Sequence, residues 1–289
     1  MMSEPLLTQL ATRLTRPVDD ASRAVARVHL LDWLACIAGG RDSEAASLGS
    51  AVSMRGWERA TYGGAHIAME AEHCSANISP GPIVLPAALS MPSAAMEARL
   101  DAIVRGYEAA LAIGGALDDH HFGHWHGTST CGVFGACAAF GSVIGFAGVE
   151  YANALGNAGS VAGGLLHFRH YPDLLTGPWH VYNAVRTGRD AALHVHYGAT
   201  GPQQVLEGAQ GVFAAMTQAA SDLGTYGDGW LIQSLGNGAG ADVAAIKDKM
   251  LVQAQAGGLN EQQAQSAIAL ALDGDDTDAL DTLLEEWTK

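Results

Sequence analysis

Apolar side chains recur at helical spacing in two long stretches of the chain. Residues 18–38 place an apolar side chain every three or four positions, and Gly39 and Gly40 follow. Residues 94–117 repeat this pattern and end near a second glycine pair, Gly114 and Gly115. This period brings the apolar residues onto one face of a helix, and glycine often follows a helix end. Each stretch therefore predicts an amphipathic helix that its glycine pair ends or loosens.

Two further stretches consist almost wholly of small and apolar residues. Residues 132–146 read GVFGACAAFGSVIGF, and residues 151–166 read YANALGNAGSVAGGLL. Glycine and alanine let helix backbones approach closely, so we expect two central helices packed face to face. Residues 179–195 and 205–220 predict more helix, and no stretch shows the two-residue alternation of a strand. The predicted fold class is all-α, with a core of helix packed on helix.

The pattern also predicts loops and a boundary. Residues 61–86 and 117–131 are expected to be loops, and loops of this length in a compact domain are often functional. Glycines at 236–240 precede an acidic segment of helical pattern. We therefore expect a helical domain over residues 1–235 and an acidic helical extension over residues 236–289. The DGDD run at 273–276 lacks the other ligand positions of an EF-hand loop, and we interpret it as a solvated turn between two short helices.

Charge narrows the range of partners. Thirty acidic and fifteen basic residues give a net charge of -15, which repels phosphate backbones and anionic lipids. We expect neither nucleic acid nor a membrane as a partner. A local group of histidines and helix N-termini can still bind an anion. No stretch has the roughly 20 apolar residues of a membrane span, and no basic region precedes an apolar run at the N-terminus, so we expect a cytoplasmic protein. The four cysteines lack CxxC spacing and are interpreted as buried free thiols.

Four histidines lie within seven residues, just before the most apolar stretch. They are His120, His121, His124 and His126, and they stand in the run HHFGHWHGTSTCG. One interpretation is a polar loop whose hydroxyl residues cap the following helix. A second is a metal site, but no acidic or thiol ligand spacing accompanies the histidines. We favour a third, proton transfer, because a histidine can take or give a proton near neutral pH.

A second group of titratable side chains precedes a proline-rich turn. Glu70, Glu72 and His73 lie in the run HIAMEAEHCSANISPGPIVLPAAL. A rigid turn of this kind can present side chains to a site. The alternative is a surface loop with solvated carboxylates, and the pattern leaves both interpretations open.

The run HGTSTCGVFGACAAFGSVIGF resembles the MmgE/PrpD family, in which a histidine precedes a Thr/Ser-rich helix start and a Gly-Ala-rich central helix. Further similar runs stand in family order: VHLLDWLACIAGG, SPGPIVLPAALSM, AIVRGYEAALAIGGAL, NALGNAGSVAGGLL and GATGPQQVLEGAQGVFAAM. Together they span roughly residues 20–220. The family is best known for 2-methylcitrate dehydratase and cis-aconitate decarboxylase. The resemblance implies an all-helical domain that dimerises, and we expect the family's smaller α+β lid to be missing or replaced by the short helical tail.

The resemblance also implies site residues. The family's active-site histidine at the start of the central helix matches His126, but its loop histidine falls on Ser79 and its lysine falls on Gly177. Its acidic loop corresponds to Glu70 and Glu72, with His73 as an addition. The residues predicted to be catalytic are His126, His124, Glu72 and His73. Those predicted to bind substrate are Ser79, Thr128, Thr130 and His180.

These observations support a divergent lyase or isomerase. It would use histidine acid/base chemistry on a small carbonyl or carboxylate metabolite, including a cyclisation in specialised metabolism. Two alternatives stay open, namely a non-catalytic binding or scaffold protein of the same fold, and one half of a split enzyme. We expect a homodimer that needs no metal ion and no organic cofactor, because no ligand set and no phosphate loop in the right context is present.

Overall fold

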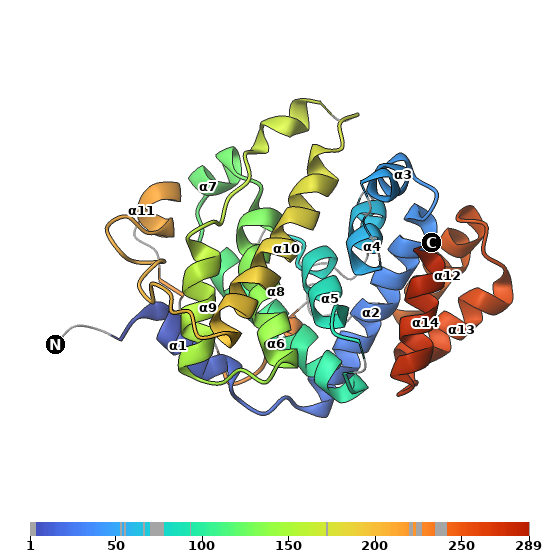
Figure 1. Ribbon diagram of the computed structural model, residues 1–289, viewed down its shortest axis with the longest axis horizontal. Coiled ribbons are helices and arrows are strands. Elements are labelled where there is room, and N and C mark those ends of the chain that lie inside the picture. The colour runs from blue at the N-terminus through green and yellow to red at the C-terminus, as the bar shows by residue number, and fades with distance from the viewer. Residues whose placement is uncertain are drawn as a thin grey trace.

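The computed structural model describes residues 4–52, 54, 56–65, 67–69, 78–92, 94–171, 173–219, 222–223, 227–234 and 242–288. These residues form α-helices and two short 3-10 helices, η1 and η2, and they contain no strand (Figure 1). The elements in chain order are α1 (Leu6–Leu14), α2 (Asp20–Gly40), α3 (Glu44–Ala51), α4 (Trp57–Gly64), α5 (Gly81–Leu89), α6 (Met96–Gly114), α7 (Asp119–His124), α8 (Gly127–Val143), α9 (Val149–Gly159), η1 (Leu166–His170), α10 (Thr176–His196), α11 (Val212–Met216), η2 (Leu231–Ser234), α12 (Val243–Ala256), α13 (Glu261–Leu272) and α14 (Thr277–Trp287). The all-α prediction is confirmed.

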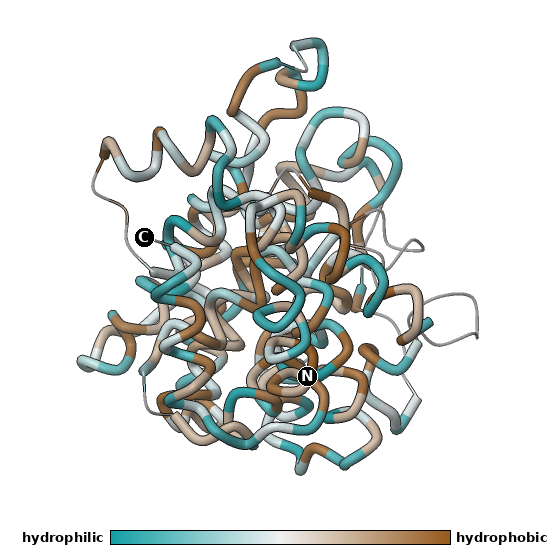
Figure 2. Tube along the Cα trace, turned by 90° about the vertical axis from the view of Figure 1, so that its right-hand side faces the viewer, coloured by the Kyte–Doolittle hydropathy of each residue, from teal (hydrophilic) through white to brown (hydrophobic). Residues whose placement is uncertain are grey.

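The Gly-Ala-rich helix α8 lies at the centre, as predicted. It packs against α5, α6, α9 and α10 (Figure 1). Glycine makes the close approach possible, because a Cβ on Gly135 would lie 3.0 Å from the carbonyl oxygen of Gly106 on α6. A Cβ on Gly188 of α10 would lie only 2.4 Å from the carbonyl oxygen of Val133 on α8. Hydrophobic positions, in brown, recur between hydrophilic ones, in teal, along the trace, also where it protrudes at the top of the view (Figure 2).

The glycine pair expected to end the first helix is part of that helix. Helix α2 begins after Asp19, whose side chain accepts a hydrogen bond from the backbone N–H of Ser22, and it continues through Gly40. A Cβ on Gly40 would lie 2.2 Å from the carbonyl oxygen of Gly63 on α4. The glycine therefore serves the packing of α2 on α4, and the helix ends at this glycine pair, which it includes as its last two residues.

Both expected loops contain helix. The stretch 61–86 includes the end of α4 and the first residues of α5, and the stretch 117–131 includes α7 and the start of α8. Helix α7 forms because the carboxylate of Asp118 caps it, accepting from the backbone N–H of His121 at 3.0 Å. In contrast, the expected helix over 205–220 is reduced to α11, because turns at Gly208 and Gly211 interrupt it.

The helices α12 and α13 pack on the outer side of α2, and α14 packs against α13 and α4 (Figure 1). Their apolar side chains belong to the same buried core as those of α2. Lys249 of α12 donates to the Asp32 carboxylate of α2 at 2.6 Å and to the carbonyl oxygen of Ala68 at 2.5 Å. Arg99 of α6 forms two 2.7 Å hydrogen bonds to Asp281 of α14. The expected boundary near Gly236 lies outside the described residues and stays a prediction.

The DGDD run lies in the turn between α13 and α14. Asp276 caps α14 by accepting from the backbone N–H of Ala279 at 2.9 Å, and Asp275 pairs with Arg27 of α2 at 2.7 Å. The interpretation as a turn between two short helices is confirmed. Within the described ranges, no helix combines the length and apolar character that crossing a membrane requires.

Candidate active site

His126 stands at the N-terminus of the central helix. Its backbone is extended, and its carbonyl oxygen accepts from the backbone N–H groups of Ser129 and Thr130 in the first turn of α8. Its own backbone N–H donates to the carbonyl oxygen of Gly164 at 2.8 Å. The side chain makes no capping hydrogen bond, so the imidazole is directed to other partners.

The imidazole of His126 faces that of His180 from α10. The two Nδ1 atoms lie 3.4 Å apart, so a proton on one nitrogen can be donated to the other. The ring of Phe168 from η1 meets both imidazoles edge-on, with ring centroids 5.1 Å from His126 and 5.0 Å from His180. His126 thus meets two residues that lie more than forty positions further along the chain.

Burial keeps this histidine pair neutral. Loss of water around the ring, together with repulsion by the protonated form of His180 and by the Arg169 cation, lowers the pKa of His126 to about 4. Burial likewise lowers the pKa of His180. A desolvated imidazole loses the hydration that favours its cation, so both rings are uncharged at neutral pH. His126 is then in the form that can accept a proton.

His126 lines a cavity of about 320 Å³. Among the residues that the structure describes, Arg169 of η1 is the charged side chain that lines this cavity. The hydroxyl side chains of Thr128 and Ser79 also line it, and the Thr128 hydroxyl accepts from the backbone N–H of Ser79 at 3.0 Å. The remaining lining residues are Ala65, Ile67, Ala68, Met69, Pro82, Phe168, Gly177, Pro178 and Val181.

Three of the predicted site residues that the structure describes do not line this cavity: His180, which contacts His126 beside it, and also His124 and Thr130. His124 lies exposed on α7, where its Nδ1 is 2.8 Å from the carbonyl oxygen of His120. Thr130 is fully buried one turn into α8, and its hydroxyl lies near the carbonyl oxygens of His126 and Gly163. The capping of α7 turns His124 outward, and helix geometry points Thr130 into the packed interior. The structure therefore separates both from the cavity that His126 lines.

The four neighbouring histidines do not form one cluster. His121 is fully buried, and its ring stacks on Trp125 with centroids 5.5 Å apart. The rings of His120 and His124 lie against each other, with centroids 4.4 Å apart, and both also contact Trp125, whereas His126 lies beyond this group against Phe168 and His180. The predicted catalytic residues Glu72 and His73 lie outside the described residues, as does Glu70.

Arg169 and Phe168 are the site residues that the sequence pattern did not single out. They stand in the run LHFRH, which carries three basic or titratable side chains in an otherwise acidic chain. That local excess is a signal, but it does not reveal that η1 folds back over His126. The glycine at position 164, with a φ of 118°, allows the backbone to turn there so that its carbonyl meets the His126 N–H.

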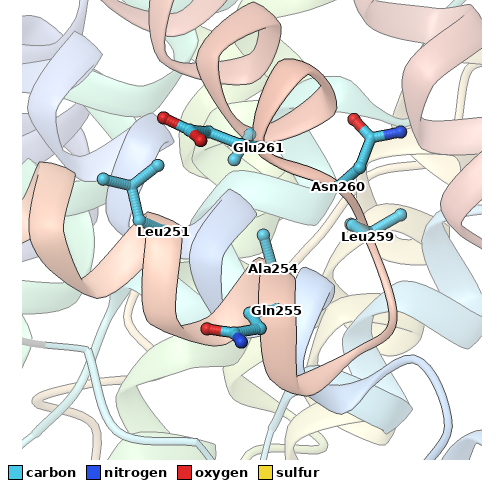
Figure 3. A pocket seen from close by; sticks show the side chains of 7 residues that line it. Leu251, Ala254, Gln255, Leu259, Asn260 and Glu261 are labelled. Atoms are coloured by element: carbon cyan, nitrogen blue, oxygen red, sulfur yellow. The ribbon is translucent and has the colours of Figure 1, made fainter.

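A second hollow of about 410 Å³ lies at the turn between α12 and α13 (Figure 3). Its titratable side chain is Glu261, and the other lining residues are Leu251, Ala254, Gln255, Leu259, Asn260 and Ala264. These groups offer no acid/base pair, so the cavity at His126 is the better candidate. Across the described ranges, no three His, Cys, Asp or Glu side chains come together as a metal site, and the expected absence of a metal stays a prediction.

A comparison with known protein families matches the part of the chain that forms this cavity. A model of the MmgE/PrpD N-terminal domain matches residues 62–222, which is more than half of the chain. The matched span holds α5 to α11 and each residue that lines the cavity at His126. The search of curated proteins finds no match.

Proposed function

The chain belongs to the MmgE/PrpD family of dehydratase-like enzymes, and we propose from this premise that it is a lyase or isomerase that moves a proton on a small carboxylate or carbonyl compound. The observation that supports this most is the pairing of His180 with His126, which lines a cavity together with Arg169. It combines a neutral base with a cation for an anionic substrate.

The pair can hold His126 in a basic tautomer. If Nδ1–H of His126 donates to Nδ1 of His180, the Nε2 lone pair of His126 is free to take a proton from carbon. The positive charge that develops on the His126 ring is then stabilised by the acceptor nitrogen of His180. This arrangement gives the two rings different roles, with His126 as the base and His180 as the group that orients it.

Arg169 and the first turn of α8 would hold the substrate. A guanidinium can bind a carboxylate through two parallel hydrogen bonds, and the helix N-terminus favours negative charge. A carboxylate bound there would also raise the pKa of His126 from its low value in the empty cavity, which strengthens the base when substrate is present. The Thr128 hydroxyl can supply a further hydrogen bond at the same wall.

Hydrogen exchange tests this function without knowledge of the full reaction. Small carboxylic and oxo acids are incubated with the purified protein in D₂O, and deuterium next to the carbonyl is measured by NMR. We expect exchange with the native protein and a loss of roughly two to four orders of magnitude in His126→Ala. His124→Ala is the matched control, because this exposed histidine lies outside the cavity, and it should keep the native rate. Exchange that persists in His126→Ala would contradict the proposal.

A further inference from the structure

Among the residues that the structure describes, the cavity at His126 is lined by one cation and a wide apolar wall. Arg169 is its charged lining residue in the described part of the chain, and Ser79, His126 and Thr128 are its other polar ones. The other described lining residues are glycine or carry apolar side chains. A site with one cation can pair one carboxylate, and any further carboxylate would lose its water without gaining a counter-charge.

The ring of Phe168 fills the space beside His126 and His180. Its ring meets His126 and His180 edge-on, and a Cβ built on Gly177 would lie 3.2 Å from its Cε2 atom. The ring therefore occupies the space that a side chain at position 177 would need. As a result, the wall next to the base is the Phe168 ring, with no side chain from position 177 of α10.

We propose that the substrate is a small acid with a single carboxylate and an apolar chain or ring, and that the Phe168–Gly177 pair selects it. The carboxylate binds Arg169, and the apolar part packs on Phe168 and Val181. Burial of that part stabilises the complex, while a second carboxylate at the same place is rejected. The cavity volume of about 320 Å³ suits a small molecule. This inference rests on the proposed function and names its substrate class.

Three acids of equal carbon number test the selection. Dissociation constants are measured by NMR titration for hexanoate, adipate and propane-1,2,3-tricarboxylate. We expect the native protein to bind hexanoate at least about tenfold more tightly than either polycarboxylate. The double variant Phe168→Ala/Gly177→Lys, which removes the ring and adds a cation, should reverse this order. Tyr171→Ala changes an exposed aromatic residue of the same segment and should keep the native preference.

The outcomes separate this inference from the proposed function. Loss of all carboxylate binding in Arg169→Gln, together with the hexanoate preference, supports the inference. A native preference for adipate or the tricarboxylate overturns the inference but leaves proton transfer at His126 untouched, since deuterium exchange tests that function independently. Hexanoate binding that persists in Arg169→Gln, or a preference that the double variant retains, also overturns it. If circular dichroism shows that the double variant is misfolded, Phe168→Leu is used in its place. This variant keeps an apolar wall and should preserve the preference for hexanoate.

Discussion

At the scale of the residue, the position of His126 changes its chemistry. Burial is the main cause that lowers its pKa to about 4, and the neighbouring charges of His180 and Arg169 act in the same direction. A base must be unprotonated to act, and a low pKa keeps His126 unprotonated over the physiological range. The same low pKa makes the ring a weak base until an anionic substrate arrives.

The pH dependence of turnover follows from this value. The ratio kcat/KM reports groups of the free enzyme, so we expect it to stay level from neutral pH down to about pH 5 and to fall as His126 gains its proton near pH 4. The deuterium exchange rate at low substrate concentration measures it. An acid limb centred near pH 6.5, the ordinary value for histidine, would mean that the catalytic base is a solvated imidazole elsewhere.

His121 has a structural position in spite of its place among the four histidines. Its ring is fully buried on Trp125, and neither ring nitrogen has a hydrogen-bond partner among the described residues. We expect His121→Ala to lower the free energy of unfolding by about 2–4 kcal/mol, because it leaves a cavity. His121→Phe keeps the stack and removes two unpaired polar atoms, so it should raise that free energy by about 1 kcal/mol. Urea denaturation measures both, and equal losses in the two variants would contradict this account.

At the scale of the element, the central packing depends on glycine. The helix α8 is close to α6 and α10 because side chains are absent where the backbones approach. The sequence signals this with its Gly-Ala content, but it does not state which glycines meet which helix.

Gly188 of α10 tests that packing. A methyl group there would lie 2.4 Å from a backbone oxygen of α8, and backbone cannot move aside as a flexible side chain can. We expect Gly188→Ala to lower the free energy of unfolding by about 1–3 kcal/mol, the usual range for overpacking. Gly123→Ala on α7 is the matched control, because its added Cβ would meet no atom within 4 Å. Thermal unfolding of the two variants measures this difference, and Gly188→Ala should have the lower melting temperature. Equal melting temperatures would count against tight packing at Gly188.

At the scale of the whole molecule, buried histidines link stability to pH. Burial lowers the pKa of His29 to about 3 and that of His121 to about 4, as it does for His126. In the unfolded chain each ring takes up a proton near pH 6.5. Below that pH the unfolded state binds more protons than the native state, so stability is lost as the pH falls from 6.5 toward the folded values.

The size of this effect is measurable. As the pH falls over that window, each of the three rings lowers the free energy of unfolding by about 1.4 kcal/mol per pH unit. Together they should lower it by roughly 4 kcal/mol between pH 6 and pH 5. Denaturation at pH 7, 6 and 5 checks the slope. His121→Phe removes one of the three groups and should reduce the slope by about a third. A free energy of unfolding that is unchanged between pH 7 and 5 would contradict these burials.

We also propose that the chain forms a homodimer. Large apolar side chains are exposed near η1 and the start of α10, among them Leu165, Leu174 and Trp179. Exposed apolar groups of this kind are typical of protein interfaces. Light scattering at micromolar concentration should give twice the mass of the chain, and Leu174→Asp/Trp179→Glu should shift it toward the monomer. A clean monomer for the native protein would contradict the proposal.

The sequence by itself determined the all-α fold class, the central position of the Gly-Ala-rich helix, the family and the candidacy of His126. These follow from local periodicity, composition and a contiguous motif, which physical chemistry links directly to helix formation and close packing. The pattern also named Ser79, Thr128 and His180, and the structure places all three at or beside the cavity. The exact helix ends were less predictable, since α2 includes Gly39 and Gly40 before it ends.

Only the tertiary structure decided which of these residues meet. His124 and Thr130 are close to His126 in sequence, yet the cap at Asp118 and the turn of α8 direct them elsewhere. Arg169 and Phe168 lie some forty residues away and reach the cavity because η1 folds back over the start of α8. Such contacts depend on how helices pack, and the energy of packing is spread over the whole core. A local pattern therefore carries little information about them, and the low pKa of His126 likewise arises from burial that only the folded chain creates.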